Sequence, residues 1–228
     1  MPLLTSANIA CGFHAGDPMT MRETVAAAAR HGVAIGAHPG YPDLMGFGRR
    51  DLGATPSEIT AYVIYQIGAL DAVCRAGGTR LRYVKAHGAL YNRAVADRVV
   101  ADAIADAIRL VDPSLVMLGL SGSTLIAAGD AAGLRTASEA FADRAYTSDG
   151  TLVPRSVPGA VVRDTDAVVA RALRMVTTGS VMAIDGTSVA VRADSLCVHG
   201  DTPGALALVQ ALRTHLDHHG VRVAPFVR

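Results

Sequence analysis

The sequence contains a single lysine. Lys85 stands among 21 lysine and arginine side chains, and all the others are arginine. Lysine carries a compact charge whose pKa shifts readily on burial, whereas arginine stays charged and favours bidentate contacts. Lys85 ends a short apolar run and precedes His87 by two residues. We therefore predict that this position takes part in chemistry.

Other absences narrow the class of protein. The three cysteines, Cys11, Cys74 and Cys197, are far apart and form no CxxC motif, so we expect inert thiols in a reducing, cytoplasmic compartment. No apolar run is long enough to span a membrane, and the first residues lack the pattern of a signal peptide. The net charge is +1, with no basic stripe and no tryptophan. Membrane and nucleic-acid partners are therefore not expected.

Two common catalytic motifs are also missing. The chain has no GxSxG motif for a nucleophilic serine, and its glycine- and serine-rich stretch GLSGSTL lacks the lysine of a P-loop. The chain thus has no visible nucleotide-binding fingerprint of its own. Acid–base chemistry by lysine, histidine, aspartate or glutamate is the better interpretation.

Short apolar runs alternate with helical patterns along the whole chain, which indicates an α/β fold with a parallel sheet. The number of strand–helix units favours one (β/α) barrel domain over residues 1–228. Asp17 before Pro18 predicts one helix start, and Thr55 with Glu58 predicts another. The helices are expected at 18–32, 55–78, 97–111, 123–133, 165–179 and 202–220, and the strands at 3–12, 33–38, 81–87, 115–120 and 135–141, with a hairpin and a further strand within 181–200.

Histidines gather at the predicted strand ends. His14, His38, His87 and His199 each follow a strand and have glycine or proline within two residues. In a (β/α) barrel these ends meet on one face, so we predict a polar active site there. The other four histidines lie at or near helix ends, where cationic side chains suit the helix dipole; they are His31, His215, His218 and His219.

Acidic and guanidinium side chains accompany these histidines. Asp17 and Asp201 suit helix capping and catalysis equally well. The polar loop 142–160, with Arg144 and Arg155, is either a solvated loop or a lid that binds a carboxylate or phosphate. Arg49 and Arg50 allow the same two interpretations. Imidazoles with carboxylates also form metal sites, but no pair of the strand-end histidines has HxH or HxxxH spacing, so a divalent metal stays an open question.

Several long motifs, in order, resemble the LamB/YcsF family: ANIACGFHAGDP, GAHPGYPDLMGFGRR, VKAHGALYN, FADRAYTSDGTLVPRS and CVHGDTPGA. The resemblance runs from about Thr5 to the C-terminus. It implies an irregular seven-stranded (β/α) barrel similar to the polysaccharide deacetylase superfamily. It also implies opening of the 5-oxoproline lactam to L-glutamate with ATP hydrolysis, together with 5-oxoprolinase subunits B and C as partners.

The resemblance indicates which residues belong to the site, and their chemistry suggests what each of them does. Lys85 is expected to neutralise negative charge that develops on the substrate, while His87 or His14 activates water. A carboxylate from Asp17, Asp43 or Glu139 is expected to orient the histidines, and Arg144 or Arg155 to hold the substrate carboxylate. The expected catalytic residues are His14, Asp17, His38, Lys85, His87 and Glu139. The expected substrate-binding residues are Asn8, Asp43, Arg49, Tyr91, Asn92, Arg144, Arg155, His199 and Asp201.

The sequence departs from the family pattern in two places. Family members usually begin with a strand of the form D-L-N-x-D-x-G-E, and this chain starts after it, which is expected to remove one barrel strand and its acidic residues. Ala86 stands where the family commonly has proline, and we expect little effect. Two rival functions remain: a stand-alone metal-dependent amide hydrolase or deacetylase, and a non-catalytic protein that binds the substrate within the complex.

Overall fold

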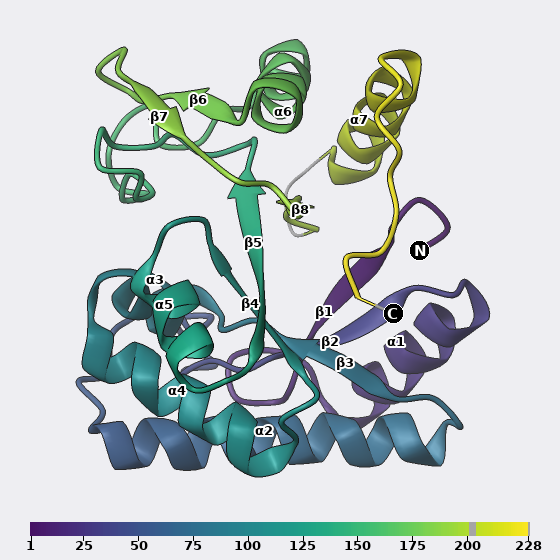
Figure 1. Cartoon of the computed structure of the whole chain (residues 1–228). Helices are drawn as coiled ribbons and strands as arrows, with labels where there is room; N and C mark the ends of the chain where they lie inside the picture. Colours follow the sequence, from purple (N-terminus) through teal and green to yellow (C-terminus); the bar gives the residue numbers. More distant parts are fainter. Residues whose placement is uncertain (201–203, 228) are drawn as a thin grey trace. The chain divides into compact units, whose positions relative to one another are not determined.

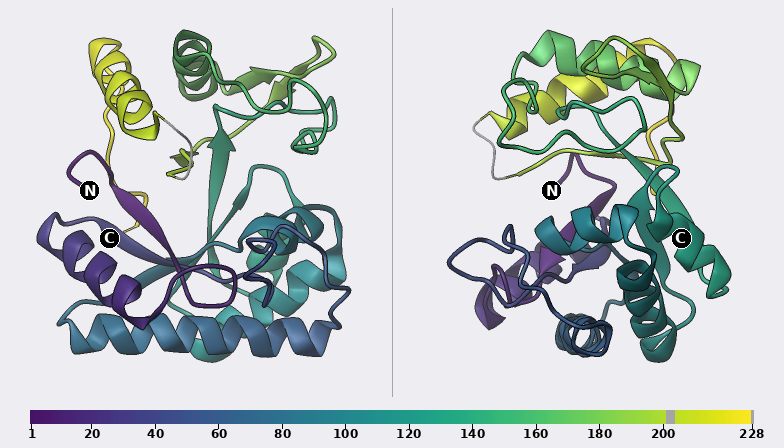
Figure 2. Two further views of the ribbon diagram at one scale, coloured as in Figure 1. Left: turned by 180° about the vertical axis from the view of Figure 1, so that it is seen from behind. Right: turned by 90° about the vertical axis from the view of Figure 1, so that its left-hand side faces the viewer.

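A computed structural model describes residues 1–200 and 204–227 of the chain. These residues form two compact units. The first consists of Met1–Gly119, Ser123–Ala137 and Pro225–Arg228, and the second of Leu120–Gly122 and Ser138–Ala224. Figures 1 and 2 trace the path of the chain, which leaves the first unit along strand β5 and returns to it at the C-terminus.

The first unit contains the parallel sheet that the sequence predicts. Strands β1 (Ser6–Ala10), β2 (Ala34–His38), β3 (Leu81–Val84) and β4 (Val116–Leu120) lie side by side in this order, and each of them pairs in parallel with the next. Strand β5 (Arg135–Phe141) follows β4 in the order, and its first residues belong to this unit. The carboxyl ends of β1 to β4 therefore lie at one edge of the sheet.

Local sequence signals explain the two helices that connect the first strands. Helix α1 (Pro18–Arg30) begins where Asp17 accepts hydrogen bonds from the backbone of Met19 and Thr20. Helix α2 (Pro56–Ala76) begins with the expected capping box of Thr55 and Glu58. Figure 1 shows α2 as the long helix running beneath β1 to β3, and it contacts both α1 and α4. Both predicted helix starts are confirmed.

Helix α3 (Gly88–Ala96) was not predicted. We expected only a strand end at this position, followed by a helix over 97–111, which is present as α4 (Arg98–Val111). The cap residue of α3 is His87, whose side chain makes no capping hydrogen bond, and Gly88 has a positive φ of 57°. The start thus lacks the usual side-chain signal. The unit also contains α5 (Thr124–Ala131), which lies within the predicted range.

An apolar cluster covers part of the sheet in the first unit. It is formed by buried side chains of β3, β4, β5 and the C-terminal segment, namely Tyr83, Val116, Leu118, Ala137 and Val227, with Phe226 packed against it. The rings of Phe226 and Tyr83 meet edge to face, with their centroids 5.0 Å apart. The last residues of the chain therefore help to bury the middle of the sheet.

The second unit contains the end of β5, which pairs in parallel with β8 (Ser195–Cys197). Strands β6 (Ser180–Met182) and β7 (Ser188–Ala190) form an antiparallel hairpin, as expected. Helices α6 (Thr165–Thr178) and α7 (Ala205–His218) contact each other. The sequence also predicts Thr202 as the cap of the last helix and Pro203 inside its start, and both residues lie outside the described residues. In residues 1–200 and 204–227, no helix combines the length and the apolar character needed to cross a membrane.

Candidate active site

Three of the four strand-end histidines come together in the first unit. His14 lies in the loop after β1, His38 is the last residue of β2, and His87 follows β3. The rings of His14 and His87 are stacked, with centroids 3.7 Å apart and planes inclined by 5°. The ring of His38 meets that of His87 edge to face, with centroids 4.8 Å apart. The predicted gathering of these three histidines is therefore confirmed.

Hydrogen-bonding contacts link two of the rings to the backbone. His38 Nδ1 lies 2.7 Å from the carbonyl oxygen of Lys85. His38 Nε2 lies 3.0 Å from His87 Nδ1, and His87 Nε2 lies 2.8 Å from the carbonyl oxygen of Phe47. The contact between the two rings is half-buried, whereas the contact with Phe47 is exposed. The two imidazoles thus form a chain between two carbonyl groups.

The loop after β2 fits closely around these rings. A Cβ atom at Gly40 would lie 2.8 Å from His14 Nδ1, and one at Gly48 would lie 2.9 Å from His87 Cδ2. Phe47 has a left-handed backbone with φ of 54°, and among the described residues it is the only non-glycine residue with positive φ. Such strained conformations are held in place by their surroundings and concentrate at functional sites. Here the conformation accompanies a carbonyl group aimed at His87.

Lys85 lies at the carboxyl end of β3, and only 5% of its surface is exposed. Its Nζ atom lies 5.7 Å from the centroid of the Tyr91 ring, a cation–π arrangement. Burial lowers the pKa of His38 well below its ordinary value, and the nearby charges of His87 and Lys85 lower it further. The single lysine of the chain therefore lies close enough to the histidines to influence their charge.

His14 is the most buried of the three imidazoles, with 2% of its surface exposed. Burial, reinforced by His87, lowers the pKa of His14 to about 3. Its Nδ1 atom has no hydrogen-bond partner among the described residues. His14 is consequently a neutral ring at physiological pH, with a buried nitrogen that lacks a hydrogen-bond partner among the described residues.

The carboxylates expected to orient these histidines make other contacts. Asp43 is buried and forms an ion pair with Arg50, which lowers the pKa of Asp43 to about 2. Asp17 caps α1 and accepts a hydrogen bond from the Thr20 hydroxyl at 2.6 Å. His38 and His87 contact backbone carbonyl groups and each other. The orienting role of the carboxylates stays a prediction.

Four further predicted residues belong to this unit. Asn8 on β1 accepts a hydrogen bond from the Tyr83 hydroxyl at 2.8 Å. The guanidinium of Arg49 lies 5.0 Å from the centroid of the Phe47 ring, next to the histidines. Tyr91 and Asn92 lie on α3, with Tyr91 buried and Asn92 exposed. Their substrate-binding roles stay predictions.

The fourth strand-end histidine lies in the second unit. His199 Nδ1 is 2.7 Å from a carboxylate oxygen of Asp143, and the guanidinium of Arg155 is 3.3 Å from His199 Nε2. The other carboxylate oxygen of Asp143 is buried and has no hydrogen-bond partner in the described part of the chain. Sequence analysis missed Asp143, although it stands two residues beyond β5, where strand-end residues are expected.

The remaining predicted residues of this unit differ in their surroundings. Glu139 on β5 is almost fully buried. Arg144 is also buried, and its guanidinium donates hydrogen bonds to the carbonyl groups of Val153 and Ala160 within the loop 142–160. Asp201 lies outside the described residues. The roles of all three residues stay predictions.

Side chains with other expected roles occupy the expected places. His31 and His219 cap the C-terminal ends of α1 and α7, and His215 and His218 lie in the last turn of α7. Burial raises the pKa of the Cys11 thiol to about 12, so this thiol is inert at neutral pH. Within residues 1–200 and 204–227, no group of three His, Cys, Asp or Glu side chains has an arrangement that could hold a metal ion.

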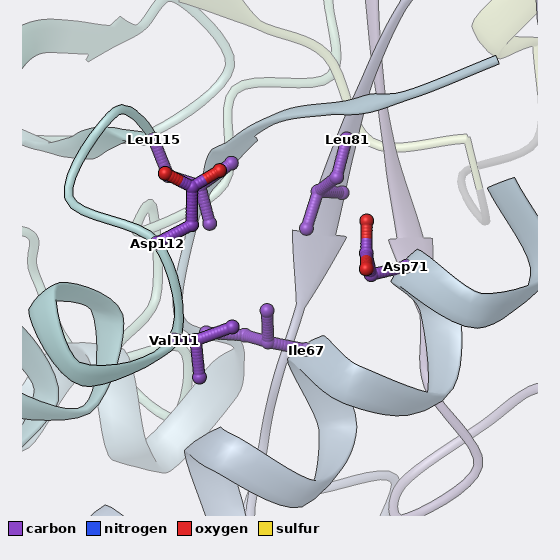
Figure 3. A pocket seen from close by; sticks show the side chains of 6 residues that line it. All are labelled: Ile67, Asp71, Leu81, Val111, Asp112 and Leu115. Atoms are coloured by element: carbon purple, nitrogen blue, oxygen red, sulfur yellow. The ribbon is translucent and has the colours of Figure 1, made fainter. Parts of the chain in front are cut away.

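A hollow of about 190 Å³ lies at the opposite edge of the sheet (Figure 3). Leu81 at the start of β3 and Leu115 just before β4 line it, so it faces the amino ends of the strands. Its two carboxylates are already engaged, Asp71 with Arg75 at 3.0 Å and Asp112 with the Ser114 backbone at 2.8 Å. Ligands of parallel α/β sheets bind at the carboxyl ends, where the histidines are. We therefore assign the site to the histidines.

The geometry describes an α/β protein with a lysine and three imidazoles at the carboxyl ends of parallel strands. Over residues 1–228 the chain matches the model of the LamB/YcsF family. The chain belongs to this family, and the resemblance seen in the motifs is confirmed.

Named relatives are similar over nearly the whole chain. The 5-oxoprolinase A subunit of Syntrophobacter fumaroxidans is 53% identical over 223 residues, which cover 98% of this chain and 88% of the relative. The 5-oxoprolinase A subunit of Streptomyces avermitilis is 55% identical over 226 residues, covering 99% and 90%. A solved structure, the lactam utilization protein from Thermus thermophilus, is 50% identical with a TM-score of 0.92, covering 98% of this chain and 89% of the other.

Proposed function

We propose that this chain acts as the A subunit of an ATP-dependent 5-oxoprolinase, which opens the lactam of 5-oxoproline to L-glutamate. The observation that carries the proposal is the identity of 53% and 55% to relatives with this name, over 98% and 99% of the chain. The buried Lys85 beside three imidazoles supports it, because the reaction needs both charge stabilisation and proton transfer.

The chemistry of the lactam gives each group a role. Amide resonance makes the ring carbonyl a poor electrophile, and its activation develops negative charge on the oxygen or on the phosphate that ATP transfers to it. A preorganised ammonium such as that of Lys85 stabilises this charge in a site with little water. His87 or His14 accepts a proton from the attacking water. For the second unit taken by itself, we propose that Arg155 and His199, which contact each other, have a substrate-binding role.

ATP and partner subunits complete the proposal. The chain has no P-loop, so we assign ATP to the assembled complex with subunits B and C rather than to residues of this chain. ATP would supply phosphorylation of the amide oxygen, which makes ring opening feasible. A single (β/α) barrel of the polysaccharide deacetylase type, in the cytoplasm, remains part of this proposal.

The test is turnover by the assembled complex. The chain is mixed with subunits B and C, and release of glutamate and of ADP is measured with and without 5-oxoproline. We expect glutamate and ADP to appear together, and only when all three subunits are present. Equal rates without this chain, or ATP hydrolysis that does not depend on 5-oxoproline, would contradict the proposed function.

A further inference from the structure

Three hydrogen-bonding contacts of His38 and His87 determine how many protons the two rings need. Their partners are the Lys85 carbonyl at 2.7 Å, the other ring at 3.0 Å and the Phe47 carbonyl at 2.8 Å. A carbonyl oxygen only accepts hydrogen bonds, so each terminal contact requires an N–H on the ring. The contact between the rings requires one more. Three protons are needed on four nitrogens, whereas two neutral imidazoles carry only two.

A neutral pair consequently leaves one of the three contacts without a proton. Two lone pairs then face each other at hydrogen-bond distance, either between the rings or between a ring and a carbonyl oxygen. One added proton satisfies all three contacts at once and spreads a single positive charge over the pair. The geometry of the pair therefore favours the uptake of one proton.

We infer that His38 and His87 function as a single proton-accepting pair, in which His87 exchanges the proton with the substrate and His38 is a positioning residue. This inference rests on the proposed function for the identity of the reaction. His87 Nε2 is the exchanging atom, because its contact with Phe47 is exposed whereas the contact between the rings is half-buried. Movement of the Phe47 carbonyl away from His87 would open this nitrogen to a ligand.

The surroundings keep the pair from holding a proton permanently. The burial of His38 and the nearby charge of Lys85 both oppose a positive charge on the pair. The loop packed against His87 adds the charges of Arg49 and of the Asp43–Arg50 ion pair. The hydrogen bonds and these charges act in opposite directions, so the pair can gain and lose a proton during one turnover.

The strained backbone at Phe47 supports a functional role for the contact between its carbonyl group and His87. Phe47 has a φ of 54°, in a backbone region that residues other than glycine and asparagine rarely adopt. The next residue, Gly48, also has a positive φ, and a Cβ atom there would lie 2.8 Å from His14 Cβ. The chain thus maintains an unfavourable backbone conformation at the point where a carbonyl group meets His87.

The proton count of the reaction matches such a pair. With the amide oxygen phosphorylated by ATP, water attacks the ring carbon, a C–O bond forms, the electrons of the C=N bond move to the ring nitrogen, and the water proton goes to the pair. The pair returns this proton to the ring nitrogen, the C–N bond breaks, and the proton of the new hydroxyl group passes to the departing amine. A second water hydrolyses the acyl phosphate that remains to the carboxylate and inorganic phosphate, and the proton released there completes the ammonium group. The pair ends neutral, as it began, and no oxidant or reductant is involved.

Nitrogen NMR of the full-length chain, labelled at the histidine rings, tests the pair directly. We expect the His38 and His87 signals to shift together with one midpoint as pH falls over about 8 to 4, with the uptake of one proton. Separate midpoints for the two rings, or rings that both stay neutral throughout, would overturn the inference. The test variant is His38→Gln, because the glutamine amide can form hydrogen bonds but cannot take up a proton. The matched control is His31→Gln at the exposed end of α1.

The variants also separate this inference from the proposed function. In His38→Gln we expect the midpoint of His87 to move by about one pH unit or more, which is a tenfold change in proton affinity. In the assembled complex, the acidic limb of kcat/KM for 5-oxoproline should move by the same amount, and His31→Gln should leave it unchanged. An unmoved His87 midpoint in His38→Gln overturns the pair. Absence of turnover in the wild-type complex would overturn the proposed function. The NMR titration would still show whether His38 and His87 take up one proton together.

Discussion

The ring of Tyr83 lies over Gly36 on the neighbouring strand, so closely that a Cβ atom at Gly36 would stand 2.2 Å from two ring atoms. Asn8, Gly36 and Tyr83 are in register across β1, β2 and β3. The absence of a side chain at Gly36 allows the Tyr83 hydroxyl to reach the Asn8 amide oxygen at 2.8 Å. The packing of three strands thus depends on one glycine.

Gly36→Ala should therefore destabilise the fold. We expect a loss of about 1–3 kcal/mol in the free energy of unfolding, because the new methyl group overpacks a buried ring. Urea unfolding of the variant measures this loss. Gly68→Ala in α2 is the control, because no atom lies within 4 Å of its added Cβ, and alanine there should stabilise the helix by about 0.5–1 kcal/mol. Equal stability of Gly36→Ala and wild type would contradict the close packing.

His14 should make the fold sensitive to acid. The pKa of His14 is about 3 in the folded protein, against an ordinary value of 6.5. Between these values the unfolded chain binds a proton at His14 that the folded chain does not, so the free energy of unfolding falls as pH decreases from 6.5. At pH 5 the loss from this residue is about 2 kcal/mol relative to neutral pH.

Urea unfolding of wild type and His14→Gln at several pH values measures this effect. The variant should lose less stability than wild type as pH falls from neutral to about 5. Parallel pH dependences for the two proteins would mean that His14 is not held neutral by the fold.

Lys85 should be essential for turnover, although it is dispensable for folding. Lys85→Met keeps the length of the buried side chain and removes its charge, so we expect kcat of the assembled complex to fall by about 10²- to 10³-fold, with a similar melting temperature. Lys85→Arg should also lose most activity, because the larger planar group does not reproduce the point charge. Arg30→Met at the exposed end of α1 is the control. Retained turnover in Lys85→Met would remove Lys85 from the mechanism.

The contact between Asp143 and His199 should influence kcat/KM more than the stability of the fold. Asp143 accepts from His199 Nδ1, which leaves Nε2 of a neutral ring to accept from Arg155. Asp143→Ala removes the group that orients this ring, and we expect kcat/KM to fall by about tenfold. Asp166→Asn in the first turn of α6 is the matched change of an exposed carboxylate. Equal kinetics for both variants would show that the orientation of His199 has no influence on turnover.

Features that depend on residues close together in the sequence could be predicted. The starts of α1 and α2 follow from Asp17 with Pro18 and from Thr55 with Glu58, and each cap acts within three residues. Helix α3 could not be predicted in this way, because its first residue is a glycine with positive φ and its cap side chain makes no hydrogen bond. Its start depends on the loop that packs against it, where Ala89 donates to the Gly48 carbonyl at 2.8 Å.

The site was predictable in its residue types and only partly in its contacts. Histidines that follow parallel strands were expected to meet, and three of them do. The contact between His38 and His87 joins residues 49 positions apart, and that between Asp143 and His199 joins residues 56 apart. No local spacing encodes such pairs. The left-handed conformation of Phe47 was also invisible, because phenylalanine is not a residue that signals it.

The single lysine has a practical consequence for labelling. Apart from the terminal amine, Lys85 Nζ is the only primary amine in the chain, and its surroundings expose just 5% of the residue. An acylating reagent that reacts with amines would therefore report on one internal position without interference from surface lysines. The rate of its reaction, followed by intact mass, would measure how often the interior around β3 becomes accessible to solvent.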